Sequence, residues 1–491
     1  GFFFFLIIFS TLVDYIIGWW LYGTKNEVYR RLLLAASVFI NLFVLAYFKY
    51  TFFFTSAIND MFGTNLVAYN YLAEFSNLLT GTSFDTAKIF LPVGISFFTF
   101  QTMSYTLDIY RKELEPVKSI IDFGFYVSFF PQLVAGPIVR AKDFIPQIYQ
   151  KFSLSRYEFG LALFIILKGL IKKIMIGDYI AVNFVDRVFA NPTMYTGFES
   201  LMAMIGYSLQ VYVDFSGYTD IAIGVALLMG FRLNQNFNSP YKAKNTGEFW
   251  SRWHISLSSW LKDYLYIPLG GNRNATAGTY INFALILGVV MMLASSLWVS
   301  LGIVVGVILV LIIMRISPAA KKGVVRNINI MITMLFGGLW HGSSWNFLIW
   351  GGLNGLGVVT YKYWRKISPW EKYNNVIATV WKITLTFGFI TFTRVFFRAP
   401  DYETATTMLH RIRTAFSTEL IPQIISGYYK VWLMMLFGFI THWLSYNFKD
   451  TWRDKFINLP HWTQALISAL IIFIIYQSIC SDMVAFIYFQ F

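Results

Sequence analysis

Apolar runs recur along the whole chain, and many are close to the length that crosses a lipid bilayer. A helix needs about 20 apolar residues to span a hydrocarbon core of roughly 30 Å. Such runs cover residues 2–22, 32–55, 90–107, 120–135, 159–176, 201–229, 280–314, 328–361, 377–397, 431–444 and 465–489. Some are long enough for two passes. We therefore predict an all-α polytopic membrane protein with about 11–13 transmembrane or re-entrant helices.

The run at 328–361 is too long to be one membrane helix. As a single helix it would measure roughly 50 Å, and both flanks are basic, which predicts that both ends lie on one side of the membrane. Its middle holds Gly337, Gly338, Gly342, Ser343 and Ser344. We predict a broken or re-entrant helix pair, and such breaks are tolerated only where protein or a water-filled cavity surrounds the backbone.

A second unusual stretch is 247–273. Charged side chains alternate there with tryptophan and tyrosine, so the stretch is too charged to span the membrane. It is amphipathic enough to lie at an interface or to line a cavity. Pro268 and the Gly270–Gly271 pair are expected to end it.

The composition favours one membrane domain. Hydrophobic residues make up 57% of the 491 residues, and only 13% are charged, against about 25% charged in an average soluble domain. The mean hydropathy is +0.56. No polar block is long enough to form a soluble domain, so we predict a single membrane domain over residues 1–491.

The formal net charge of +14 comes largely from basic residues in short loops beside apolar runs. This pattern is typical of loops on the cytoplasmic side, with attraction to anionic lipid headgroups as a second effect. We therefore expect membrane lipid, and not nucleic acid, as a partner. The first apolar run has no basic region before it, which argues against a cleavable signal peptide.

Several kinds of chemistry are excluded by the residues present. Cys480 is the one cysteine, so no internal disulfide forms, and it lies in an apolar tail without a nearby base. The sequence has no G-x-S-x-G, P-loop or H-E-x-x-H motif. Well-separated histidines without a carboxylate at ligand spacing make a poor zinc site. We predict neither a metal nor a resident cofactor.

His341 is the strongest catalytic candidate among the five histidines. It lies in the uncharged middle of the 328–361 run, where a polar ring is costly without partners and indicates function by default. The alternative is a histidine that hydrogen-bonds across two helices as a structural contact. A buried neutral imidazole can take a proton from a hydroxyl at neutral pH. This ability suits direct acyl transfer from a thioester to an alcohol.

Other polar residues interrupt apolar or amphipathic stretches. His254 shares a helix face with Ser258, and taken alone it is better explained as a solvated interfacial histidine. Asp214 and Asp220 interrupt the run at 201–229. They could relay protons in a transporter. We favour the alternative that they bond the backbone at a helix break near Gly217.

Eight stretches follow one another through almost the whole chain. They are LPVGISFFTFQTMSYTLDIYR from Leu91, FFPQLVAGPIVR from Phe129, KGLIKKIMIGDYIA from Lys168, QVYVDFSGYTDIAIG from Gln210, FRLNQNFNSPY from Phe231, FWSRWHISLSSWLKDYLYIPLGGNR from Phe249, GGLWHG from Gly337 and the closing FIYFQF. In this order they resemble the membrane-bound O-acyltransferase family, in the bacterial branch typified by the alginate O-acetyltransferase membrane subunit.

The resemblance implies roles for particular residues. His341 falls on the histidine of the family's WHG motif, the catalytic base, and His254 falls on that of RWHISLS, the second polar residue of the site. The resemblance therefore replaces the interpretation of His254 as a solvated interfacial histidine with a role in the site. The remaining expected substrate-binding residues are Trp340, Asn346, Ser258, Asp214 and Arg252.

The resemblance also implies a setting for the reaction. The two histidines would lie along a channel through the bacterial inner (cytoplasmic) membrane. A cytoplasmic thioester donor, expected to be acetyl-CoA, would pass its acetyl group towards an exported polysaccharide. A periplasmic or extracellular acetyltransferase partner would finish the transfer. Arg252, Lys262 and Arg273 could hold the donor's phosphates, although anchoring on the cytoplasmic side explains their charges better.

The chain departs from the family pattern between the GGNR and GGLWHG motifs. In relatives a short linker usually joins these two motifs. Residues 280–314 intervene here, with Ser295 and Ser296 near the centre and basic residues on both flanks. We predict an inserted transmembrane hairpin. Two other functions stay open: a proton-coupled transporter that uses the aspartates and histidines, and a channel-like scaffold that docks another enzyme without acyl chemistry.

Overall fold

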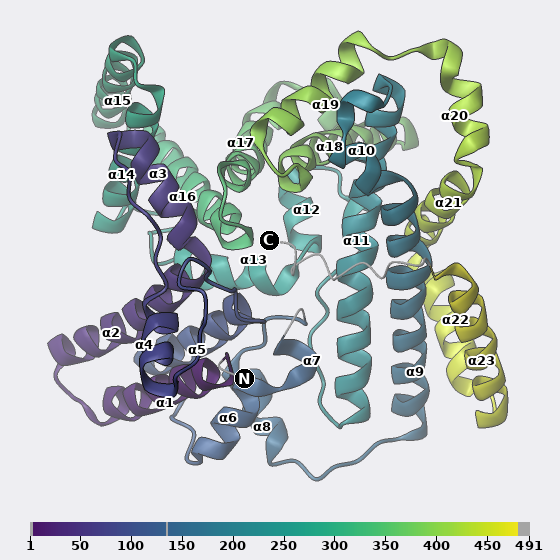
Figure 1. Cartoon of the computed structure of the whole chain (residues 1–491), viewed down its shortest axis with the longest axis horizontal. Helices are drawn as coiled ribbons and strands as arrows, with labels where there is room; N and C mark the ends of the chain where they lie inside the picture. Colours follow the sequence, from purple (N-terminus) through teal and green to yellow (C-terminus); the bar gives the residue numbers. More distant parts are fainter. Residues whose placement is uncertain (1–2, 134–135, 480–491) are drawn as a thin grey trace. The chain divides into compact units, whose positions relative to one another are not determined.

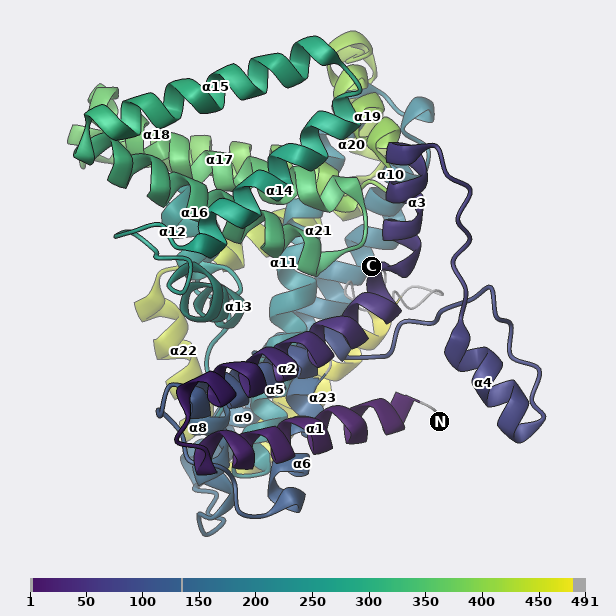
Figure 2. The same ribbon diagram turned by 90° about the vertical axis from the view of Figure 1, so that its left-hand side faces the viewer.

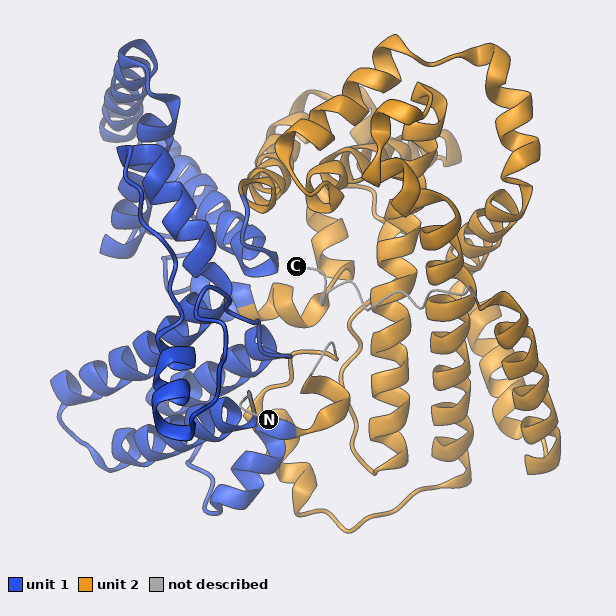
Figure 3. Cartoon of the chain, viewed as in Figure 1, with its two compact units in different colours: residues 1–128, 261–344 blue, residues 129–260, 345–491 orange. Residues whose placement is uncertain are grey.

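The computed structural model describes residues 3–133 and 136–479, and every regular element in these ranges is a helix. The closing FIYFQF stretch and Cys480 lie outside the described residues. By contacts the chain divides into two compact units, coloured separately in Figure 3: residues 1–128 with 261–344, and residues 129–260 with 345–491. The single membrane domain stays a prediction.

The first unit contains the N-terminal helices and those that precede His341. Its elements are α1 (Phe3–Gly23), α2 (Glu27–Leu45), η1 (Ala46–Tyr50), α3 (Thr51–Phe62), α4 (Tyr71–Thr80), α5 (Ile95–Tyr110), α6 (Ile120–Ser128), η6 (Lys262–Tyr266), α14 (Ala277–Ala294), α15 (Leu297–Ile316) and α16 (Pro318–His341).

The second unit contains the central and C-terminal helices. Its elements are α7 (Phe130–Leu133), α8 (Ala141–Ile148), α9 (Arg156–Leu170), η2 (Ile171–Asp178), η3 (Ala181–Val185), α10 (Asp186–Ala190), η4 (Pro192–Met194), α11 (Gly197–Leu228), η5 (Pro240–Lys242), α12 (Thr246–Arg252), most of α13 (Ile255–Leu261), α17 (Trp345–Ile367), η7 (Pro369–Lys372), α18 (Val376–Arg398), α19 (Tyr402–Thr414), η8 (Thr418–Leu420), α20 (Ile421–Gly427), α21 (Tyr429–Trp443), α22 (Tyr446–Asn458) and α23 (His461–Ser478).

Eight helices in the described residues are long and apolar enough to cross a membrane. A ninth arises if the bent pair 418–427 and 429–443, which meet at 83°, counts as one span. The prediction of a polytopic all-α protein is confirmed. The predicted 11–13 segments also included re-entrant and shorter helices, and several of those, such as α5 and α17, form without meeting the criterion for a span.

The predicted break in the 328–361 run is confirmed. Helix α16 ends at His341 and α17 begins at Trp345, so Gly342, Ser343 and Ser344 separate them. At 280–314 the chain forms α14 and α15, which are joined at Ser295 and Ser296, with Ser295 in the left-handed region at φ 46°. That this pair is an insertion relative to the family stays a prediction.

A buried polar cluster joins α1, α2 and α5, which lie together in Figure 2. The carboxylate of Asp14 accepts hydrogen bonds from Ser37 Oγ at 2.6 Å and from Asn41 Nδ2 at 2.7 Å. Thr102 Oγ1 on α5 donates to Asn41 Oδ1 at 3.1 Å. Since apolar contacts alone do little to associate helices in lipid, such hydrogen bonds help to fix the three helices.

In the second unit α9 and α11 run side by side (Figure 1). They approach closely at two glycines: a Cβ on Gly169 would lie 2.6 Å from Gly217 O, and a Cβ on Gly217 would lie 2.8 Å from Gly169 O. Small residues permit this close helix packing. The expected helix break near Gly217 was wrong, because α11 is continuous there, and the glycine serves packing instead.

Candidate active site

His341 is the last residue of α16, and its side chain is buried at 3% exposure. The final carbonyls of a helix have no partners within the helix. Three of them here receive side-chain hydrogen bonds from η1. Tyr50 Oη donates to Leu339 O at 2.6 Å, and Lys49 Nζ donates to Trp340 O at 2.7 Å and to His341 O at 3.0 Å.

This pair of donors fixes the backbone that carries His341. The element η1 is a π-helical turn, and such turns occur frequently at functional sites. An ammonium group at a helix C-terminus also balances the negative end of the helix dipole. The clamp, defined as Lys49 and Tyr50, therefore holds the end of α16 at the point where the helix breaks.

Trp340 is held from the side by α5. Its ring centroid lies 5.5 Å from that of Phe97 and 5.4 Å from that of Phe100. Its indole Nε1 donates to Ser96 O at 3.4 Å, and the ring of His341 meets it edge-on at 5.0 Å. The Trp340 side chain, which is predicted to bind substrate, is thus buried and packs beside His341. Its contact with substrate stays a prediction.

His254 occupies a strained backbone position between α12 and α13. Its φ is 45°, in the left-handed region that non-glycine residues rarely adopt. Asn236 holds the turn: its backbone oxygen accepts from Ile255 N at 3.0 Å, and its Oδ1 accepts from Ser256 Oγ at 2.9 Å. Strain of this kind persists where the surroundings fix it, often at functional sites.

The imidazole of His254 is fully buried and meets the ring of Phe215 edge-on at 4.7 Å. Burial lowers the pKa of His254 to about 3, so the ring is neutral at physiological pH. The interpretation as a solvated interfacial histidine is wrong, because the side chain is shielded from solvent. A neutral imidazole can donate or accept a hydrogen bond towards a reacting group.

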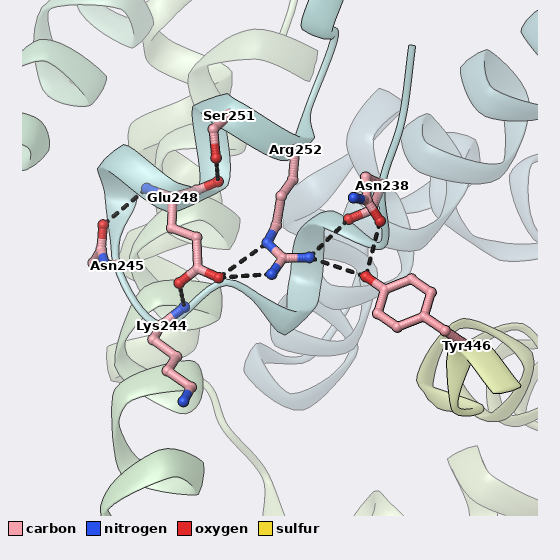
Figure 4. Close-up of polar contacts among 7 residues, drawn as sticks. All are labelled: Asn238, Lys244, Asn245, Glu248, Ser251, Arg252 and Tyr446. Atoms are coloured by element: carbon pink, nitrogen blue, oxygen red, sulfur yellow. Dashed lines mark hydrogen bonds and ion pairs between the residues drawn. The ribbon is translucent and has the colours of Figure 1, made fainter. Parts of the chain in front are cut away.

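Every guanidinium nitrogen of Arg252 donates a hydrogen bond to another group of the protein (Figure 4). Its Nε and Nη2 donate to Glu248 Oε1 at 3.0 and 2.8 Å. Its Nη1 donates to Asn238 O at 3.2 Å and to Tyr446 Oη at 3.0 Å, and Tyr446 Oη donates to Asn238 Oδ1 at 2.8 Å. The guanidinium ties α12 to α22, and its role in substrate binding stays a prediction.

The two aspartates of α11 are ion-paired with lysines on either side of Gly169. Asp214 lies 2.6 Å from Lys173 Nζ, which also contacts Asp178 at 2.7 Å. Asp220 lies 2.7 Å from Lys172 and 3.1 Å from Lys168. Carboxylates held by lysines are poor proton relays. These pairs could not be found from sequence alone, because the lysines are about forty to fifty residues away along the chain.

The two remaining predicted residues differ in their contacts. Ser258 Oγ donates to Trp253 O at 3.3 Å, so it closes the turn that carries His254. Asn346 is buried, and its Nδ2 donates to Ala399 O at 3.1 Å. Within the described residues the Oδ1 of Asn346 accepts no hydrogen bond. That oxygen is a candidate acceptor for a substrate hydroxyl.

The predicted residues divide between the two units. His341 and Trp340 belong to the first unit, and His254, Ser258, Asp214, Arg252 and Asn346 belong to the second. The buried His341 thus belongs to the first unit and the buried His254 to the second, and side-chain hydrogen bonds fix the backbone at each. Sequence analysis missed Lys49 and also Gln101 on α5. Gln101 is fully buried, and both of its amide atoms are without a hydrogen bond in the described residues.

Helices that can cross a membrane, separated by basic loops, define a multi-pass membrane protein. The family model for the membrane-bound O-acyltransferase family matches residues 39–304. This match spans more than half of the chain and contains both His254 and Lys49. The chain belongs to the membrane-bound O-acyltransferase family, and the resemblance seen in the sequence is confirmed.

Curated relatives agree with this assignment. The peptidoglycan O-acetyltransferase of Helicobacter pylori is 33% identical over 430 residues, which cover 82% of this chain and 69% of that protein. The probable alginate O-acetylase AlgI of Pseudomonas aeruginosa is 34% identical over 413 residues, covering 82% of this chain and 65% of that protein. The teichoic acid D-alanyltransferase of Bacillus subtilis is 27% identical over 307 residues, which cover 61% of this chain and 67% of that protein. The chain spans about two thirds of the length of these relatives.

Proposed function

We propose that this chain transfers an acyl group, most often acetyl, from a cytoplasmic thioester donor such as acetyl-CoA. The acceptor is a hydroxyl group of an exported polysaccharide or of a partner protein. The bacterial cytoplasmic membrane is the proposed location, and an extracytoplasmic acetyltransferase is the proposed partner. The observation that carries the proposal is His341, a buried histidine at the break of a membrane helix, with the backbone clamped by Lys49 and Tyr50. The relatives named as acting on peptidoglycan, alginate and teichoic acid support the acceptor class.

The proposed reaction needs one base and two bound substrates. The imidazole of His341 removes the proton of the acceptor hydroxyl while the hydroxyl oxygen attacks the thioester carbonyl carbon. The tetrahedral intermediate then expels the thiolate as the carbon–sulfur bond breaks. The proton held on His341 passes to the thiolate sulfur, so the products are an ester and a free thiol. His254 would position the acceptor or polarise the thioester carbonyl.

The transporter alternative has lost its main support. It relied on Asp214 and Asp220 as carriers of protons, and both carboxylates are ion-paired with lysines. A relay through these groups would require each ion pair to open and close with each turnover. The acyl-transfer proposal needs no such rearrangement of α9 and α11.

The test uses purified protein in lipid nanodiscs with radiolabelled acetyl-CoA, comparing wild type with His341→Ala. His410→Ala is the matched control, because His410 is an exposed histidine on α19. We expect turnover in wild type and His410→Ala, and a loss of about a hundredfold to ten-thousandfold in His341→Ala, as for removal of a general base. Wild-type turnover in His341→Ala would refute its role as the base. No turnover in any protein, with a partner extract supplied, would favour the scaffold.

A further inference from the structure

His442 has a polar side chain that the proposed reaction does not use. It lies at the end of α21 and is buried at 3% exposure. Neither ring nitrogen makes a hydrogen bond within the described residues. The ring meets Tyr212 edge-on at 4.8 Å and lies 5.2 Å from the ring of Tyr241. Buried polar groups are nearly always hydrogen-bonded. A bound ligand would supply the hydrogen bond that this imidazole lacks within the described residues.

Two lysines flank the end of α21, and neither has a carboxylate partner among the residues that the structure describes. Lys449 Nζ donates to His442 O at 3.0 Å, and Lys242 Nζ donates to Leu444 O at 2.8 Å. Lys242 also lies 4.9 Å from the ring centre of Tyr446, which Arg252 contacts on its hydroxyl (Figure 4). In the described part of the chain neither ammonium group has an acidic side chain within 4 Å; their nearest partners are neutral carbonyls and an aromatic ring.

A third lysine reaches the same place from η2. Lys172 Nζ lies 5.4 Å from the ring centre of Tyr212, the ring that meets His442. Its carboxylate partner, Asp220, is shared with Lys168. The positive charges of Lys172, Lys242 and Lys449 all act on His442, and those of Lys242, Lys172 and Lys168 act on Lys449. Burial, followed by these three lysines, lowers the pKa of Lys449 to about 8.

Within the described residues the charges of this cluster are not balanced. Four lysine charges face one carboxylate, Asp220, and the C-terminus of α21, which supplies only about half a negative charge. The helix end explains why Lys242 and Lys449 lie where they do, but it leaves an excess of about two and a half positive charges. The neighbouring cation Arg252 is already neutralised by Glu248 at 2.8 Å. An anion that carries about two charges would balance the cluster.

We propose that Lys172, Lys242 and Lys449, grouped around His442, bind the phosphate of a phosphate-bearing ligand. Lysine binds phosphate as a mobile point charge, and a ring N–H of His442 can donate to one of its oxygens. The cluster extends to the protein surface at Lys168 and Lys172, whose side chains are 42% and 20% exposed. The same chemistry is offered by a soluble nucleotide phosphate and by a lipid headgroup. The proposal does not depend on acyl transfer by His341.

The test measures binding to the full chain in nanodiscs by the rise in its unfolding temperature, since a ligand that binds only the folded state stabilises it. The soluble probe is adenosine 3′,5′-bisphosphate, added to phosphatidylcholine discs. The lipid probe is phosphatidic acid, which replaces part of the phosphatidylcholine. The variant is Lys242→Gln/Lys449→Gln. We expect it to weaken binding about tenfold or more for each lysine, as for hydrogen bonds to charged groups.

The matched control is Lys244→Gln/Lys455→Gln. It removes the same two charges from the same two segments, and both lysines are exposed. The ammonium of Lys244 points away from Arg252 in Figure 4, and Lys455 lies over the ring of Trp452 at 4.9 Å. We expect this control to bind as wild type does. If the test variant does not fold, His442→Phe keeps the ring shape and removes the nitrogens, and it should also weaken binding.

The source of the phosphate follows from which arm responds. Stabilisation by the bisphosphate, competed by inorganic phosphate, identifies a soluble ligand, whereas stabilisation by phosphatidic acid alone identifies a lipid headgroup. The proposal is overturned if wild type responds to neither probe. It is equally overturned if the variants that fold among Lys242→Gln/Lys449→Gln and His442→Phe respond as wild type does.

Discussion

Lys49 Nζ donates to the carbonyl oxygen of His341 at 3.0 Å, although nearly three hundred residues separate the two along the chain. The same ammonium donates to Trp340 O at 2.7 Å. The proposed base is therefore held through its backbone. Lys49 is a positioning residue in this scheme, because its contacts are with the helix end.

Lys49→Met should lower kcat for acyl transfer by about tenfold or more while changing KM little. The loss of two hydrogen bonds from a charged donor, each worth about 1.5–3 kcal/mol, releases the end of α16. Lys49→Arg should restore part of kcat, since a guanidinium can reach both oxygens. Lys88→Met removes an exposed lysine of the same unit and serves as the control. An unchanged kcat in Lys49→Met would show that the clamp does not position His341.

Gln101→Met should stabilise the protein by about 1 kcal/mol, because it removes a buried amide that makes no hydrogen bond to any described residue. If Gln101 contacts substrate, the same change should raise KM or abolish turnover. The comparison is Gln464→Met, at an equally buried site where Nε2 donates to Phe456 O at 3.1 Å and to Ile457 O at 3.0 Å. That variant should be less stable. Equilibrium unfolding and acetyl transfer, measured on both, separate the outcomes, and destabilisation by Gln101→Met would contradict the argument.

The neutral state of His254 predicts a pH dependence of stability. Its folded pKa, about 3, lies below its ordinary value of 6.5, so below that value the unfolded chain binds the extra proton. The free energy of unfolding should then fall by up to about 1.4 kcal/mol per pH unit as the pH drops from 6.5 towards 3. His254→Asn should flatten this slope, since asparagine does not titrate and tolerates a positive φ. His410→Asn is the control variant for this measurement. An equal slope in wild type and His254→Asn would refute the neutral state assigned to His254.

Gly217→Ala should destabilise the second unit by about 1–3 kcal/mol, as overpacking does. The new methyl would lie 2.8 Å from Gly169 O and 3.0 Å from Lys173 N, and neither backbone atom can move aside. Gly388→Ala is the control, because a Cβ there meets no atom within 4 Å. That change should be neutral or slightly stabilising, since alanine favours a helix. Reversible unfolding in detergent distinguishes the two, and equal stability would mean that α9 and α11 can separate at low cost.

Much of the fold could be predicted from the sequence, because the bilayer imposes a simple length rule. The break after His341 was predictable for the same reason, since an apolar run of about 50 Å cannot be one span and glycines and serines mark where it ends. The function of Gly217 was not predictable. A glycine inside an apolar helix is consistent with both a break and a close contact, and only the position of Gly169 decides between them.

The candidate site was predicted in its histidines but not in the groups that support them. His341 stands out because a lone polar ring in an apolar run is costly. Lys49 gives no comparable signal, since it lies towards the end of the apolar run 32–55, and a lysine there can also reach the membrane surface by extending its side chain. The burial of His254 was not apparent from its charged neighbours. Its surroundings come from Phe215 and Asn236, which adjoin it only in the folded chain.

The contact between Gly169 and Gly217 has a consequence for how this protein can evolve. A side chain gained at either position is opposed by the main chain of the other, at 2.6 and 2.8 Å. Substitution can shrink an opposing side chain, but it cannot remove an opposing peptide group. No second mutation at the facing position can therefore rescue the first. Sequence drift along α9 and α11 must leave this crossing point untouched, even where every neighbouring residue changes.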